Sequence, residues 1–140
     1  MEYREKGNLI FIRLHQDDDL FASLEEICAA CEVKVGIVVS AIGMLKQAEL
    51  KYFIESGNYS PVLYPEPLEL VSMTGNIIFQ EGEYHFHLHA VLAEENKNAL
   101  AGHLSKGKVN ATNEIVILKT DIPAERKLDE ATGLMALAFR

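Results

Sequence analysis

The sequence predicts an α+β fold, in which a mainly antiparallel β-sheet of about seven strands packs against one main amphipathic helix, with short helical turns. Three observations lead to this prediction. Apolar residues recur at helical spacing over 20–31. Most other apolar runs are short and bounded by glycine or proline, which is typical of strands. No internal repeat or linker-like stretch divides the chain, so we expect a single domain over residues 1–140.

The first strand and the helix are expected near the N-terminus. The run "NLIFIRL" (8–14) is rich in β-branched and aromatic residues, which favours a strand. Three aspartates at 17–19 supply an N-cap and an acidic first turn. The apolar stripe that follows predicts a helix of about four turns, ending within 32–36.

Cys28 and Cys31 form a CxxC motif within this helix. A redox CxxC lies at a helix N-terminus, where the helix dipole lowers the pKa of one thiol. These two cysteines lie late in the helix and belong to its apolar stripe. We therefore interpret them as buried core thiols, since a structural zinc site would need further cysteines that the chain does not contain.

The rest of the chain is expected to form strands and their connections. A turn is expected over 55–61, a loop with one short helical turn over 94–109, and a charged connection over 120–132. The expected strands are 36–42, 45–54, 68–79 (as one strand or two), 84–93, 113–119 and 133–139.

Composition narrows the partners and the location of the chain. The net charge is −8, and the thirteen basic residues are scattered, whereas phosphate binding needs them clustered. Nucleic acid is therefore not an expected partner. The longest apolar run, near 36–45, is far shorter than the roughly 20 residues that span a bilayer. The charged start "MEYREKGN" does not resemble a secretory signal, so a cytoplasmic location without membrane contact is expected.

Three of the five histidines, His85, His87 and His89, alternate along the strand expected over 84–93. Residues two apart on a strand lie about 7 Å apart and point to the same face. Two such imidazoles can reach one metal ion, whereas His85 and His89, about 13 Å apart, cannot easily share it. Either the 85/87 pair or the 87/89 pair would hold the metal, together with a ligand from elsewhere.

His103 is the candidate for that further ligand. It follows Gly102 in the expected loop, which can return over the histidine strand. Three imidazoles with an open fourth position form the donor set of a catalytic type of zinc site. The alternatives are a polar strand face without a ligand, or an acid–base role for one histidine. Glu83 and Glu114 are candidate carboxylate partners of the ligands.

Three stretches together carry a pattern that extends over most of the chain. They are "FIRLHQDDDL" (11–20), "GIVVSAIGMLKQAELKYF" (36–53) and "FHLHAVLAEENKNALAGHLSKGKVNATNEIVI" (86–117). The last stretch combines H-x-H with G-H-L at a fixed spacing. With these features the chain resembles the PPC family, the plants and prokaryotes conserved domain.

The resemblance implies a site and an assembly that spacing alone leaves open. It implies a metal site at His87, His89 and His103, with zinc as the expected ion, and it does not include His85. It also implies a homotrimer. Plant relatives carry an AT-hook beside this domain, and this chain has no such R-G-R-P-type segment, so their DNA binding is not carried over.

Three functions follow as hypotheses. The first is a zinc-binding homotrimeric module that binds a small molecule or recruits partners. The second is a zinc-dependent hydrolase or lyase acting on a small substrate, in which a metal-bound water supplies the nucleophile. The third is a DNA-binding regulator, which the acidic charge disfavours. Neither a reaction nor a catalytic residue is indicated by the sequence.

Overall fold

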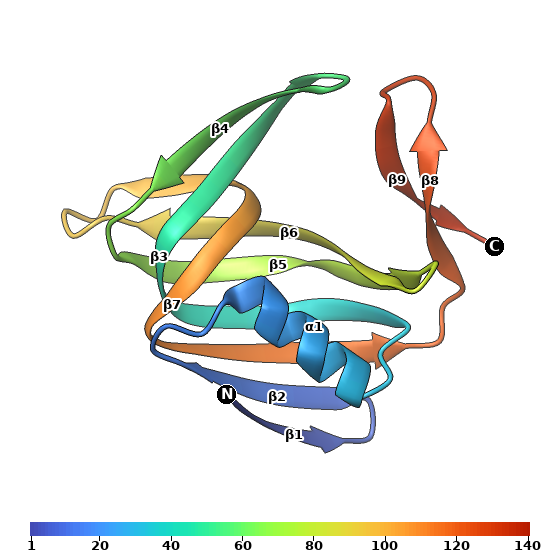
Figure 1. Cartoon of the computed structure of the whole chain (residues 1–140), viewed down its shortest axis with the longest axis horizontal. Coiled ribbons are helices and arrows are strands. Elements are labelled where there is room, and N and C mark those ends of the chain that lie inside the picture. Colours follow the sequence, from blue (N-terminus) through green and yellow to red (C-terminus); the bar gives the residue numbers. More distant parts are fainter.

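The computed structural model describes all residues, 1–140, and consists of a seven-stranded antiparallel sheet, one helix and a separate two-stranded hairpin (Figure 1). The predicted α+β class, with one helix on a mainly antiparallel sheet, is therefore confirmed. The elements, in chain order, are β1 (Glu2–Lys6), β2 (Leu9–His15), α1 (Leu20–Ala30), β3 (Val35–Glu55), β4 (Asn58–Tyr64), β5 (Leu68–Gln80), β6 (Glu83–Ala93), β7 (Ala99–Thr120), β8 (Ala124–Asp129) and β9 (Leu134–Phe139).

Two long, bent strands give the sheet its shape. The strand order is β1-β2-β7-β6-β5-β3-β4, and β3 also pairs with β7. Because β3 contacts both β5 and β7, the strands β3, β5, β6 and β7 close on themselves as a small barrel. Register shifts in β3, at 38–40, 43–45 and 46–50, let the strand bend as it passes from one partner to the next.

The helix covers one face of the sheet and closes the core. Its N-cap is Asp19, whose carboxylate accepts a hydrogen bond from the Ala22 N–H at 3.0 Å. Phe21 packs edge-on against Phe86 of β6, with ring centroids 5.9 Å apart. The face of β6 that carries Phe86 and Leu88 thus looks toward the core, and the histidines, which alternate with these residues, lie on the opposite face.

Several predicted elements differ from the structure. The helix has 11 residues, about three turns, because Cys31 already leaves the helical conformation. The strands β1, β4 and β8 were not expected, since their sequences are polar or contain proline. Both β1 and β4 lie at the edges of the sheet, where one exposed side tolerates such residues.

Residues 94–109 differ most from the prediction, which was a loop with one short helical turn. Only residues 94–98 form a connection, and β7 begins at Ala99. Its polar sequence is extended because β6 pairs with its first residues and β3 with the following ones, so two neighbours satisfy its backbone. Tertiary pairing has overridden the local preference of "NKNALAGHLSKG".

The hairpin β8–β9 forms its own two-stranded sheet beyond the end of β7. The Gln80 side chain fastens it to β5, donating to the Arg126 carbonyl at 3.2 Å and accepting from the Arg126 N–H at 2.7 Å. The hairpin rises beside the β3–β4 hairpin (Figure 1). Their tips meet, since a Cβ added at Gly133 would lie 2.0 Å from the Ser56 Oγ. No helix in the structure is of the length and hydropathy that crossing a membrane requires.

Candidate metal centre

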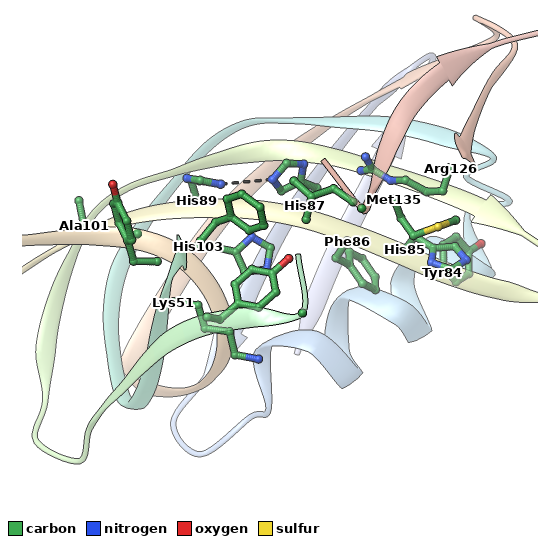
Figure 2. A pocket seen from close by; sticks show the side chains of 17 residues that line it. Lys51, Tyr84, His85, Phe86, His87, His89, Ala101, His103, Arg126 and Met135 are labelled. Carbon is green, nitrogen blue, oxygen red and sulfur yellow. Dashed lines mark hydrogen bonds between the residues drawn. The ribbon is translucent and has the colours of Figure 1, made fainter. Parts of the chain in front are cut away.

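Strand pairing brings three histidines to one place on the outer face of the barrel. His87 and His89 lie two residues apart on β6, and His103 on β7 is the direct Cα partner of His89. One ring nitrogen from each histidine lies within 4.8 Å of those of the other two (Figure 2). The grouping predicted from the sequence is therefore present, although His103 reaches it from a strand and not from a loop.

The spacing of the donor atoms fits a small ion. The Nε2 atoms of His87 and His89 lie 3.2 Å apart. Two nitrogens bound to a tetrahedral zinc at 2.0–2.1 Å are separated by about 3.3 Å, so this pair matches the ligand spacing. The ring of His103 lies 5.4 Å from that of His87 and 5.5 Å from that of His89, measured between centroids. The three rings thus surround a point that each imidazole can reach, and the residues fit a bound zinc.

His85 lies outside this cluster, in agreement with the family resemblance, whereas spacing alone had left the 85/87 pair open. Its ring lines the same pocket further along β6, on the side of Met135 and Tyr84 (Figure 2). It is not among the three residues whose donor atoms converge. His85 is therefore placed to contact a molecule in the pocket, apart from the donor atoms of the other three histidines.

The surroundings keep two of the clustered histidines neutral. Burial lowers the pKa of His87 below its usual value, and the nearby charges of Arg126 and His89 lower it further. The pKa of His103 is also lowered, by burial first and then by the neighbouring histidines and Lys51. A metal binds the neutral imidazole, so these shifts favour a ligand-competent state at pH 7.

A pocket of about 1100 Å³ opens beside the histidine cluster. This volume slightly exceeds the roughly 300–1,000 Å³ that is usual for small-molecule sites. Its walls come from β3, β4, β6, β7 and the β8–β9 hairpin, and Figure 2 shows Lys51 and Arg126 on opposite sides of the histidines. The lining residues are Lys51, Tyr52, Phe53, Gly57, Tyr59, Tyr84, His85, Phe86, His87, His89, Ala101, Gly102, His103, Arg126, Gly133, Leu134 and Met135.

The lining contains basic and aromatic side chains and no aspartate or glutamate. The prediction that Glu83 and Glu114 are carboxylate partners of the histidine ligands is therefore wrong. Glu114 lines a different hollow beside β1 and β2, and Glu83, at the start of β6, does not line the pocket. Arg126 and the tyrosines of β3 and β4 were not found from the sequence, because nothing local indicates that these strands would meet β6.

Cys28 and Cys31 take no part in the site. Both are buried, free thiols in the core, as predicted. Burial raises the pKa of Cys28 to about 12, with a smaller contribution from Cys31. A thiol with so high a pKa is neither a metal ligand nor a nucleophile near neutral pH.

Comparison with solved structures supports the same fold. The metal-containing protein AF0104 of Archaeoglobus fulgidus is 28% identical with a TM-score of 0.84, covering 98% of this chain and 96% of that one. A Bacteroides thetaiotaomicron protein, named as a suspected DNA-binding protein, is 24% identical with a TM-score of 0.90, covering 99% and 96% of the two chains. The second likeness, at this identity, shows the fold alone.

Sequence comparison identifies the family. The bifunctional protein GlmU of Synechococcus sp. strain JA-2-3B'a(2-13) is 31% identical over 128 residues, which are 90% of this chain. The chain spans only about a fifth (19%) of the length of that relative, so the match is to one segment of it. The model of the Plants and Prokaryotes Conserved (PCC) domain matches residues 1–121, and the chain therefore belongs to this family.

Proposed function

We propose that this protein is a metal-binding module that holds Zn²⁺ through His87, His89 and His103 and presents the open position of the ion to the adjoining pocket. The observation that carries the proposal is the convergence of three imidazole nitrogens within 4.8 Å, two of them at 3.2 Å. The metal-containing relative from Archaeoglobus fulgidus, with the same fold, supports it. Without a metal, the two imidazoles at 3.2 Å would share one hydrogen bond, and that is the alternative to be tested.

The three protein ligands leave room for a fourth. Structural zinc sites are closed by four protein donors, whereas three histidines and an exchangeable position are typical of sites that bind water or a substrate. No fourth histidine, cysteine or carboxylate joins the group. A molecule in the pocket could therefore coordinate the ion directly, and this favours a ligand-binding site over a purely structural one.

A homotrimer is the assembly that we propose for the module. Its support is an uncovered apolar face on β2 and β3, turned away from the helix. Phe11 of β2 is 59% exposed there, although it is flanked by the buried Ile10 and Ile12. The exposed apolar residues of this face are Leu9, Phe11, Ile37, Val39 and Ile42. Subunit contact would remove this surface from water.

A zinc-dependent hydrolase or lyase is the second candidate function. The pocket beside the open position favours it, because a zinc-bound water can act as a nucleophile near neutral pH. The pocket contains no carboxylate, so Lys51 and His85 are the only titratable side chains of its walls, apart from the tyrosines and the ligands, that could transfer protons. The net charge of −8 gives no support to DNA binding.

Metal analysis of matched histidine variants tests the proposal. We expect the wild type to contain one zinc per chain, and the His87→Ala and His89→Ala variants to lose it. His85→Ala is the control, since it removes a histidine of the same strand face that lies outside the cluster. After replacement of zinc by cobalt, the visible absorption spectrum would show whether the metal is coordinated tetrahedrally. Equal zinc content in His85→Ala and His89→Ala, or none in the wild type, would refute the proposed site.

A further inference from the structure

Arg126 of β8 is a buried cation at the wall of the histidine pocket. Only 6% of its surface is exposed, and burial lowers its pKa. It forms no ion pair with any carboxylate of the chain. Arginine remains charged in proteins, and a largely buried charge that no opposite charge pairs with is costly. Those guanidinium nitrogens that have no hydrogen-bond partner are not fully buried, so a bound molecule can reach them. The position of Arg126 next to a cavity therefore points to a partner that comes from outside the chain.

Most of the donor capacity of this guanidinium is free. It has five N–H donors, and one of its nitrogens, Nη2, donates to the Asn76 side chain. That is the only hydrogen bond of its side chain. The remaining donors can form the paired hydrogen bonds with which arginine recognises a carboxylate or a phosphate.

The fold holds Arg126 beside the metal centre. Both polar groups of its backbone are bound by the Gln80 side chain, which fixes β8 against the end of β5. Asn76, which accepts from the guanidinium, is the Cα partner of His87 across β5 and β6. Figure 2 shows the guanidinium end of Arg126 turned toward His87. Gln80 therefore fixes the backbone of Arg126 and Asn76 fixes its guanidinium, without a bound ligand.

The rest of the pocket suits an anion with an apolar body. The lining contains no aspartate or glutamate, in a protein whose net charge is −8. The second cation, Lys51, lies across the histidines and already pairs with Glu49 at 3.6 Å. Aromatic and aliphatic side chains, among them Tyr52, Tyr59 and Met135, form the remaining wall. Walls of this kind hold the apolar ring or chain of a ligand, while a cation binds its charged group.

We propose that this pocket binds a small organic oxyanion, a carboxylate or a phosphate monoester, with Arg126 as its anchoring residue. The inference rests on the proposed metal site in one respect only, that the same molecule is close enough to reach the open position of the ion. Arg126 lies beyond residues 1–121, the part of the chain that the family model matches. The proposed site includes the β8–β9 hairpin, which supplies Arg126, Leu134 and Met135 to the pocket.

Binding of three related probes tests the inference. Benzoate, phenyl phosphate and the neutral benzamide would be titrated calorimetrically into the zinc-loaded wild type and into its Arg126→Gln and Arg126→Lys variants. Losing a hydrogen bond to a charged group weakens binding by about 10- to 100-fold, so we expect this loss in Arg126→Gln. Arg126→Lys keeps the charge without the planar fork, and we expect it to be intermediate. Arg140→Gln, which removes an exposed arginine that pairs with Glu125, is the control.

The outcomes separate this inference from the proposed metal site. Preference for benzoate or for phenyl phosphate over benzamide, lost in Arg126→Gln, supports it and identifies the anion class. Binding that is equal for benzamide and benzoate, or unchanged in Arg126→Gln, overturns it. Full zinc content without oxyanion binding overturns it and leaves the metal site intact. If zinc is absent, the titrations on the metal-free protein still decide whether Arg126 binds the anion.

Wild-type crystals answer the question if Arg126→Gln fails to fold. Soaking with 4-bromobenzoate would place the bromine anomalous signal in the pocket, with the carboxylate on Arg126. An empty pocket in saturated crystals, or a partner subunit's carboxylate already paired with Arg126, would refute the inference.

Discussion

Gly75 of β5 packs closely against the backbone of the histidine strand β6. Replacing it with alanine should lower the stability of the protein and distort the metal centre. Its φ is +152°, a conformation that residues with a side chain rarely adopt. A Cβ at this position would lie 1.9 Å from the carbonyl oxygen of His87, where real Cβ atoms do not come within 3.0 Å. The strands β5 and β6 would have to separate by at least about 1 Å, which is enough to break ladder hydrogen bonds.

The cost of this substitution follows from two terms. Forcing a residue with a Cβ into such a conformation costs about 1–3 kcal/mol, and each lost backbone hydrogen bond costs about 1 kcal/mol. We therefore expect Gly75→Ala to lower the free energy of unfolding by about 3–5 kcal/mol in urea denaturation. Because the clash moves the backbone of His87, the remaining folded protein should bind zinc at least about tenfold more weakly.

Gly107→Ala is the matched control for this prediction. A Cβ there would meet only the side chain of Leu45, at 3.3 Å, and the backbone conformation is open to any residue. Its effect should stay within about 1 kcal/mol. If Gly75→Ala unfolds at the same urea concentration as Gly107→Ala, the close packing of β5 on the histidine strand is refuted.

Two further predictions follow from the surroundings of single titratable groups. The pKa values of His87 and His103 are lowered in the folded state, so below pH 6.5 the unfolded chain binds more protons than the native one. The stability of the metal-free protein should therefore fall as the pH drops from 7 to 5, and a double His87→Ala/His103→Ala variant should lose part of that dependence in urea titrations. The pKa of Cys28, raised to about 12 by burial, predicts that iodoacetamide labels this thiol at pH 8 only after unfolding. Rapid labelling in the native state, followed by mass spectrometry, would contradict the buried placement.

Local patterns determined those parts of the fold whose periodicity is strong. The helix over 20–30 was predictable because Asp19 caps it and its apolar residues recur every three to four positions. The histidine strand was predictable because it alternates strictly, which also separates Phe86 and Leu88 from the histidines. The same alternation showed that His85 and His89 are too far apart to share an ion.

Only the tertiary structure decided where these elements meet. Residues 99–109 are polar and contain two glycines, so no local signal marks them as a strand, and pairing with β6 and β3 makes them one. That pairing sets His103 opposite His89. The sequence had indicated His103 as a candidate ligand from a loop, and the family resemblance had selected His87 and His89 as its partners. Nothing in the sequence indicated Arg126 as a site residue, because its position depends on contacts with Gln80 and Asn76, which lie some 50 residues away along the chain. The sequence by itself thus placed three histidines on one strand face and excluded His85 and His89 as ligands of one ion, because strand alternation is a local property. Long-range strand pairing decided which histidines converge, which strands form the pocket walls and which cation lies beside them.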